Sequence, residues 1–223
     1  MREHRDIGKL YDRWVTSWTP WGWYTRWYLR HQSAINLPDL LGGIGPGPHP
    51  RLLDVGCACG VYLAEAYESG HGHQVLAGVD LSGEQIEIAR SRLARITSDE
   101  TVVRLAKASA TELPFEDASF DAVISNAMIK YLDDAGMQAF LAESARVLRP
   151  GGWLAMGEFG RDAGLLAPGA RRAMRCGPER FRSEKQQAEL LVRAGFIETR
   201  GFQMRRLRRI PFLMEGASGR LPA

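Results

Sequence analysis

Two apolar segments, each closed by an aspartate, constrain the fold of this chain more than any other feature. The first, LLDVGCACG, runs from Leu52 to Gly60, and the second, QVLAGVD, ends at Asp80. An apolar run that gives way to small residues is typical of a buried strand entering a tight turn. The distance from Asp54 to Asp80 fits one strand–helix–strand unit. The sequence therefore predicts such a unit, with a carboxylate near the end of each strand.

The turn between Gly56 and Gly60 is suited to contact with a ligand. Its small residues leave the backbone bare, and a helix beginning near Val61 directs unpaired N–H groups into the same space. A dinucleotide fingerprint, G-x-G-x-x-G, would need glycine where this chain has Ala58 and Val61. Asp54 would also repel a pyrophosphate. The turn therefore favours another adenosine-containing cofactor, whose ribose diol Asp80 could bind.

Four ordered segments resemble the motifs of class I S-adenosylmethionine-dependent methyltransferases. They are D-x-G-x-A-x-G from Asp54, the strand ending at Asp80, SATELPFEDASFD with the following AVISNAM, and ARVLRPGGWLAMGE. They resemble the branch that includes the ubiquinone and menaquinone C-methyltransferases and many small-molecule methyltransferases. The resemblance covers roughly residues 50–160. It implies an α/β, doubly wound, mostly parallel seven-stranded sheet with a C-terminal antiparallel hairpin and an N-terminal helical lid.

The resemblance also implies where the cofactor lies. The turn would hold the methionine end of S-adenosyl-L-methionine (product S-adenosyl-L-homocysteine), Asp80 the ribose hydroxyls, and Leu81 the adenine face. Asn126 would lie next to the sulfonium, where the acceptor approaches. The cofactor-binding residues expected in this way are Asp54, Gly56, Cys57, Ala58, Gly60, Asp80, Leu81, Gln85, Ser109, Ala110 and Asn126.

Two residues depart from the family pattern. Ala58 replaces a glycine, which a tight turn tolerates if φ is negative there. Ser109 stands where the family usually has an aspartate that pairs with the adenine amino group. A hydroxyl can accept that hydrogen bond, but without charge the bond is expected to be weaker.

Periodicity predicts alternating strands and helices along the rest of the chain. Ser82 is a candidate helix N-cap. A Gly/Pro-rich linker before Pro50 separates an N-terminal aromatic helical lobe, 1–49, from a cofactor-binding domain, 50–223. Strands are expected near 51–55, 74–79, 101–106, 120–125 and 152–158, helices near 60–70, 83–97, 133–148 and 183–194, and a strand pair within 195–204 and 208–216.

The N-terminal lobe is rich in tryptophan and tyrosine. Tyr11, Trp14 and Trp18 fall on one helical face. These residues are candidates for a lid over an apolar or aromatic acceptor. Packing on the sheet as ordinary core, or contact with a membrane surface, are alternatives that the sequence leaves open.

Composition limits the partners and the compartment. No secretory signal or apolar run of membrane-spanning length is visible, which predicts a cytoplasmic protein. The three cysteines and five histidines show no metal-ligand spacing, so no metal is expected. Residues 171–223 hold 13 Lys/Arg and 5 Asp/Glu. These basic C-terminal strands could contact an anionic ligand or a membrane surface, or be simply solvated; no specific nucleic acid is expected.

Methyl transfer needs a base only if the acceptor must lose a proton. The candidates near the fourth and fifth strand ends are Asn126, Lys130, Tyr131 and Glu158. The main hypothesis is in-line methyl transfer to an O, N or C atom of a small organic acceptor. Methylation of protein or nucleic acid, and a non-catalytic cofactor-binding subunit, are the alternatives.

Overall fold

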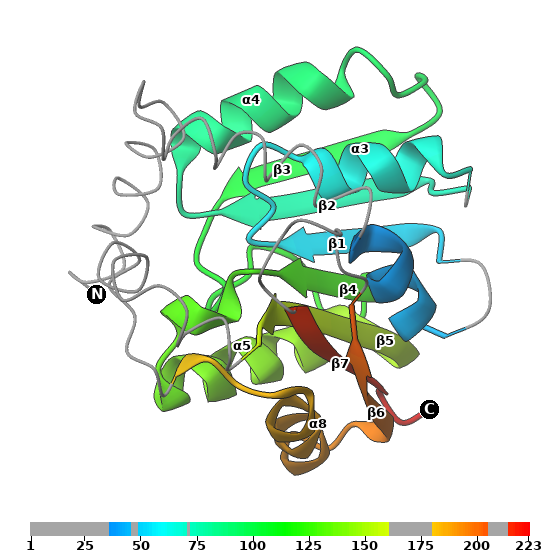
Figure 1. The fold of residues 1–223 in the computed structure, drawn as a ribbon. Coiled ribbons are helices and arrows are strands. Elements are labelled where there is room, and N and C mark those ends of the chain that lie inside the picture. Colours follow the sequence, from blue (N-terminus) through cyan, green and yellow to red (C-terminus); the bar gives the residue numbers. More distant parts are fainter. Residues whose placement is uncertain (1–35, 46–48, 71, 161–179, 205–213) are drawn as a thin grey trace.

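One mixed sheet organises the part of the chain that the structure describes. The computed structural model describes residues 36–45, 49–70, 72–160, 180–204 and 214–223. Within these residues the sheet has seven strands in the order β3-β2-β1-β4-β5-β7-β6 (Figure 1). The strands are β1 (Arg51–Val55), β2 (Val75–Asp80), β3 (Val102–Lys107), β4 (Phe120–Asn126), β5 (Leu148–Phe159), β6 (Ile197–Gln203) and β7 (Met214–Arg220).

The directions of the strands confirm the predicted fold class. Strands β1 to β5 are parallel to one another, whereas β7 is antiparallel to both β5 and β6. Parallel neighbours need a connection that crosses the sheet, and the helices between them supply it. The result is a doubly wound sheet with an antiparallel pair at the C-terminal edge.

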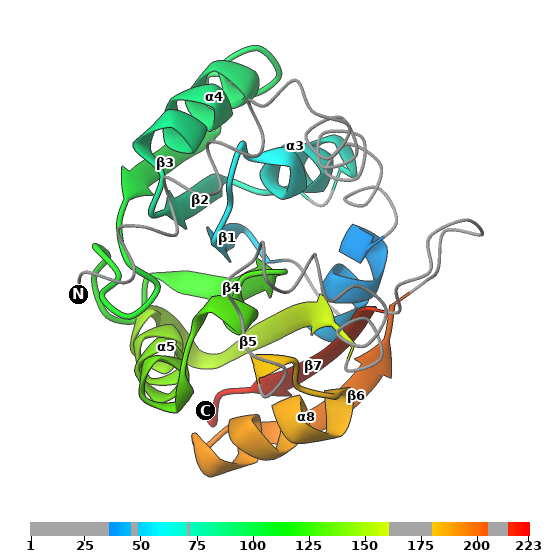
Figure 2. The same ribbon diagram turned by 60° about the vertical axis from the view of Figure 1, so that its left-hand side comes forward.

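Helices cover both faces of the sheet (Figures 1 and 2). Helices α3 (Val61–Glu68) and α4 (Gly83–Leu93) lie on one face together with helical residues 36–43. Helices α5 (Asp134–Val147) and α8 (Glu184–Arg193) lie on the other face. The Ser82 side chain accepts a hydrogen bond from the Gln85 N–H, which confirms it as the N-cap of α4. Among the described helices, none has the length and apolarity needed to cross a membrane.

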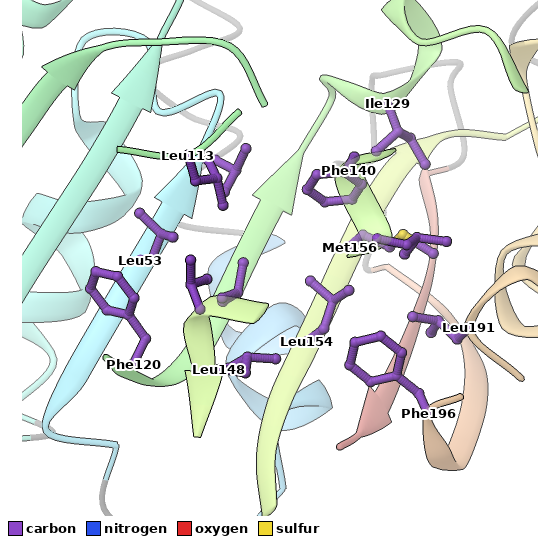
Figure 3. Packing of buried hydrophobic residues seen from close by; sticks show 14 of the residues in the cluster. Leu53, Leu113, Phe120, Ile129, Phe140, Leu148, Leu154, Met156, Leu191 and Phe196 are labelled. Atoms are coloured by element: carbon purple, nitrogen blue, oxygen red, sulfur yellow. The ribbon is translucent and has the colours of Figure 1, made fainter. Parts of the chain in front are cut away.

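Successive residues of the central strands supply two separate cores. Leu52 packs with α3 and α4, and its neighbour Leu53 packs toward α5, as expected for a strand buried on both faces. Figure 3 shows Leu53 with Phe140 and Met156 in the core on the α5 side of the sheet. Each strand is therefore fixed from both sides, which holds the strand ends in register.

Two predicted strand positions were wrong. The last strand was expected at 208–216, but β7 extends to Arg220 through the small residues Gly216–Gly219. Strand β5 begins at Leu148 rather than near 152, because the Pro-Gly-Gly turn forms an irregularity within it: Phe120 pairs with Leu148, and Ala122 pairs with Trp153. The small residues of β7 have low strand propensity, but the pairing of β7 with a strand on each side overrides that propensity.

The described residues before β1 pack on the sheet. Leu37, Leu40 and Ile44 are buried in the same core as Leu52. The division of the chain at residue 49 stays a prediction. The proposed lid residues Tyr11, Trp14 and Trp18 lie outside the described residues, as do the arginines between Met204 and Met214.

The small residues of β7 lead to a first prediction, on Gly216. A Cβ at this position would lie 2.6 Å from the Phe202 ring and 2.7 Å from the Met156 carbonyl oxygen, which is backbone and cannot move aside. We expect Gly216→Ala to lower the free energy of unfolding by about 2 kcal/mol or more, measured by urea denaturation. Gly42→Ala is the control, because this helical position has open space around it and alanine favours helix. Equal stability of the two variants would contradict this packing.

Candidate functional site

The strand order reverses direction between β1 and β4, and this is where the candidate site lies. The chain moves outward from β1 to β2 and β3, then returns to β4 on the other side of β1. In open α/β sheets, ligands bind beyond the carboxyl ends of the strands at such a point. Here the turn after β1, the end of β2 and the end of β4 meet, and they carry most of the candidate residues.

The turn after β1 needs glycine at two positions. Gly56 and Gly60 have φ values of 81° and 70°. A Cβ on Gly56 would lie 2.7 Å from Met128, and one on Gly60 would lie 2.9 Å from Ala89. The N–H groups of Gly56 and Cys57 both donate to the carbonyl of Val79, at 2.8 and 3.0 Å. These bonds fix the turn against β2 and bring helix α3 to the crevice.

Ala58 corrects an expectation about this turn. Alanine was expected to be tolerated there with a negative φ, but φ of Ala58 is 44°. A left-handed alanine costs roughly 1–2 kcal/mol. One compensation is visible: the Ala58 N–H donates to Asp80 Oδ2 at 3.0 Å. The strained residue is therefore held by a carboxylate from the next strand.

Asp80 connects three elements at the crevice. Its Oδ2 binds the turn after β1, and its Oδ1 accepts from the Ser82 N–H at 2.8 Å, at the start of α4. Both of its oxygens thus accept backbone N–H groups, one from the turn after β1 and one from the start of α4. A ribose contact for Asp80, and for neighbouring Leu81 a contact with adenine, remain predictions. Gln85 follows in the first turn of α4 and is fully buried. Its side-chain amide atoms have no hydrogen-bond partner in the ranges that the structure describes.

Asp54 is a buried carboxylate without full hydrogen bonding. Only 2% of the residue is exposed, and its Oδ2 has no hydrogen-bond partner among the residues that the structure describes. Burial, together with the nearby charge of Asp80, raises the pKa of Asp54 to about 8. Burial also raises the pKa of the neighbouring Cys57 thiol, and the charge of Asp54 raises it further. A cation at this point would stabilise the Asp54 carboxylate, whereas an anion would be repelled.

The end of β4 carries a polar cluster that sequence reasoning identified only in part. Asn126 donates through Nδ2 to the hydroxyl of Tyr62 on α3, and within the described part of the chain its Oδ1 has no hydrogen-bond partner. Burial, and then Asp54, raise the pKa of Tyr62 far above its usual range. Asn36 is also fully buried and donates to the Met214 sulfur at 2.7 Å. Tyr62 could have been found in the sequence, since it lies in the first turn after the glycine loop; Asn36 had no such signal.

Lys130 and Glu158 form a buried ion pair at the ends of β4 and β5. The Lys130 Nζ lies 3.4 Å from Glu158 Oε1, and the two side chains are 3% and 0% exposed. Glu158 also accepts from the backbone N–H groups of Lys130 and Phe159, at 3.0 and 2.8 Å. The ammonium lies 4.5 Å from the centre of the Tyr131 ring. Each charged group is thus held by a partner, and the expectation that one of them acts as a base stays a prediction.

Ser109 and Ala110 follow β3 and lie on the Asp80 side of the crevice, since the Ala108 N–H donates to the Asp80 carbonyl at 3.0 Å. Ser109 Oγ accepts from the Thr111 N–H at 3.2 Å and lies 2.8 Å from Thr111 Oγ1. The hydroxyl is therefore already used within its own turn. This local bonding leaves Ser109 as a neutral group with reduced capacity for a ligand.

The structure thus divides the candidates into two groups. One surrounds the turn after β1, with Asp54 and Asp80 at its centre. The other surrounds the end of β4, with Asn126, Lys130, Tyr131 and Glu158. Among the described residues, no three His, Cys, Asp or Glu side chains gather as metal ligands would.

Comparison with known proteins agrees with this geometry. Residues 52–152 match a family model described as a methyltransferase domain. The chain is 33% identical over 175 residues to the 27-O-demethylrifamycin SV methyltransferase of Amycolatopsis mediterranei, covering 73% of this chain and 60% of the relative. It is 39% identical over 119 residues to an O-methyltransferase of Aspergillus nomiae, covering 53% and 50%. The chain therefore spans only about half to three-fifths of the length of these relatives.

A solved structure matches almost the whole chain. It is a methyltransferase of Thermotoga maritima, described as dependent on S-adenosylmethionine and as a possible histamine N-methyltransferase. The match covers 96% of this chain and 99% of the other, with a TM-score of 0.69 and 23% identity. At this level of identity the match supports the fold.

The burial of Asp54 gives a prediction on stability and pH. Its pKa is about 8 in the folded chain and about 4 when unfolded, so the folded state holds an extra proton between these values. The preference of the folded state for the protonated Asp54 side chain stabilises the fold at low pH. This stabilisation is lost as the pH rises through about 8. We expect Asp54→Asn to gain stability relative to the unmodified chain by more than about 1 kcal/mol between pH 5 and pH 8.5. Chemical denaturation of both proteins at the two pH values measures this difference; identical pH dependence would contradict it.

Proposed function

We propose that this chain belongs, through its methyltransferase domain at residues 52–152, to the class I S-adenosylmethionine-dependent methyltransferases, and that it methylates a small organic acceptor. The observation that carries the proposal is the crevice between β1 and β4. It combines a bare left-handed turn, a buried carboxylate that lacks a partner and a second carboxylate on the next strand. This set suits a cofactor with a cationic end and a ribose.

The residues of the crevice fit the cofactor. The unpartnered Oδ2 of Asp54 is an acceptor suited to the ammonium of the methionine end. Asp80 would hold the ribose hydroxyls, and Leu81, Gln85, Ser109 and Ala110 would surround the adenine. The bound cofactor supplies a methyl group that its sulfonium makes electrophilic. The protein then has to place the acceptor in line with that group, and proximity alone can give a large rate effect.

Apolar side chains lie beside the polar cluster at the end of β4, which supports an acceptor with an apolar body. Met128 lies against Gly56, and Met204 lies against Gly157 beside Asn126. Phe159 closes β5, and Met214 begins β7 directly opposite it. Methionine and phenylalanine adapt to apolar ligands and exclude water. Lys130 and Glu158 hold each other, so the proposed transfer uses an acceptor that needs no proton removed by either of them.

The two described cysteines support a cytoplasmic location. Cys57 and Cys59 are free thiols at the centre of the candidate cofactor turn. A reducing compartment would keep them so.

Cofactor binding should depend on Asp80. Asparagine has the same size and keeps one oxygen for the backbone, but it loses the charge that strengthens bonds to a ribose diol. We expect Asp80→Asn to bind S-adenosylhomocysteine at least about tenfold more weakly, or about 1.4 kcal/mol, by calorimetric titration. Asp121→Asn is the matched control, since Asp121 lies at the opposite end of β4 and pairs with Arg149. Equal affinity of the two variants for S-adenosylhomocysteine would show that Asp80 does not contact the cofactor.

Ser109 tests the adenine end. An aspartate there can keep the bond to the Thr111 N–H with one oxygen and offer the other, charged, to the adenine amino group. We expect Ser109→Asp to tighten S-adenosylhomocysteine binding by about 1 kcal/mol, or roughly fivefold. Ser109→Asn separates shape from charge and should bind like the unmodified protein. Weaker binding by a folded Ser109→Asp would show that adenine does not contact this position.

The acceptor class is tested with the full chain and S-adenosylmethionine labelled in its methyl group. Small aromatic and polyketide alcohols, amines and activated carbon acids form one set, and unfractionated protein and RNA form two others. Label in a small molecule supports the proposal. Label only in protein or RNA would replace it with macromolecule methylation, and tight cofactor binding without transfer to any set would favour a non-catalytic subunit.

A further inference from the structure

The turn that follows β4, residues 127–132, is bound by positively charged side chains from two directions. Lys130 Nζ donates to the carbonyl of Ala127 from inside the turn. Arg182, which is 6% exposed, donates to the carbonyls of Ile129 and Leu132 at 3.4 and 3.5 Å. Arg180 donates to the carbonyl of Tyr131 at 3.2 Å. Four backbone carbonyls of one short turn are thus bound by cations.

Glu158 completes this arrangement from the neighbouring strand. Its Oε2 accepts the Lys130 N–H, and its Oε1 accepts the Phe159 N–H and lies 3.4 Å from the Lys130 ammonium. The ammonium also lies over the Tyr131 and Phe159 rings, 4.5 and 5.2 Å from their centres. Every oxygen of Glu158 is therefore engaged, and the ammonium is surrounded by its carbonyl, carboxylate and aromatic partners.

Stability alone does not account for burying this pair. Removing two charges from water carries a desolvation penalty that their attraction often does not recover, and well-packed apolar residues of similar volume commonly stabilise a protein as much or more. The surrounding core is apolar and would accept such residues. What an apolar pair could not do is bind the Ala127 carbonyl and the Lys130 N–H.

Those two backbone groups control the shape of the turn. Ala127 has a φ of 55°, an unfavourable conformation for alanine, and its N–H donates to the Gly157 carbonyl at 2.8 Å. Its neighbours point to the crevice: Asn126 binds Tyr62, and Met128 lies against Gly56. A change in φ at Ala127 would move Asn126 and Met128 together.

We propose that Lys130 and Glu158 are positioning residues, which hold the left-handed turn after β4 and so set where the acceptor meets the transferred methyl group. This inference rests on the proposed function for its effect on rate. The pair acts through Ala127 and its neighbours, and neither member exchanges a proton with the acceptor.

The central variant is the double substitution Lys130→Met with Glu158→Gln. Lys130→Met alone would leave a buried unpaired carboxylate and could fail to fold. In the double variant both charges are gone, and glutamine can still accept one backbone N–H. The matched control is Arg90→Met with Glu87→Gln, which neutralises the exposed ion pair on α4 at 3.7 Å.

Hydrogen exchange on the full chain tests the structural half of the proposal without any acceptor. We expect backbone amides of residues 127–132 in the double variant to exchange at least about tenfold faster, while those of β1 and β2 keep their rates. Unchanged exchange in the turn of the folded double variant would overturn the proposal, whatever the protein methylates.

Kinetics test the functional half. With the acceptor found for the unmodified chain, we expect kcat of the double variant to fall at least about tenfold while S-adenosylhomocysteine affinity changes less than about threefold. The control pair should keep both values. A double variant with faster exchange but unchanged kcat would overturn the link to catalysis. An unmodified chain that methylates nothing would instead contradict the proposed function, and the exchange result would still decide whether the pair holds the turn.

Discussion

The hydrogen bonds of Asp80 hold the candidate cofactor site together. One carboxylate, at the end of β2, binds the N–H of Ala58 in the turn after β1 and the N–H of Ser82 at the start of α4. Two strand ends and a helix start are thereby fixed around a single side chain. Because the side chain is charged, each bond is stronger than a neutral one, which helps to keep Ala58 in a conformation that alanine does not favour. The bare turn, the helix α3 that follows it and the position of Asp54 all depend on this arrangement.

Unfavourable features gather at the same edge of the sheet. Asp54 is a buried acid that lacks a partner for one oxygen, Ala58 and Ala127 have positive φ, and Lys130 and Glu158 are charges without solvent. Strain and buried charge persist where surrounding structure over-determines them, and such places are commonly functional sites. The two cores, one with Leu52 and the other with Leu53, bury apolar side chains on both faces of the sheet and supply the stability that this edge lacks.

The sequence predicted most strands of the sheet and the position of the turn after β1, because their signals are local. Apolar runs ending in Asp54 and Asp80 gave strands β1 and β2, and the Ser82 cap gave the start of α4. It failed where long-range packing decides the backbone. The left-handed Ala58 depends on a carboxylate 22 residues away, and the small residues of β7 form a strand only because β5 and β6 lie on either side. Asn36 could not be identified at all, since its partner Met214 is 178 residues distant.

This difference in range separates the two halves of the site. The proposed cofactor half is built from one strand–helix–strand unit, so its contacts lie within a short segment of sequence. The proposed acceptor half is assembled from distant segments: Tyr62 meets Asn126 across 64 residues, Arg182 meets Ile129 across 53, and Asn36 meets Met214. Substitutions in the acceptor half can therefore change its shape while Asp54 and Asp80 stay in place. A fold divided in this way can keep one cofactor and accept different molecules, because loop and edge residues set specificity while the sheet sets the chemistry. In this chain the link between the halves is the turn after β4, which places Met128 against Gly56 on one side and is anchored to Glu158 on the other.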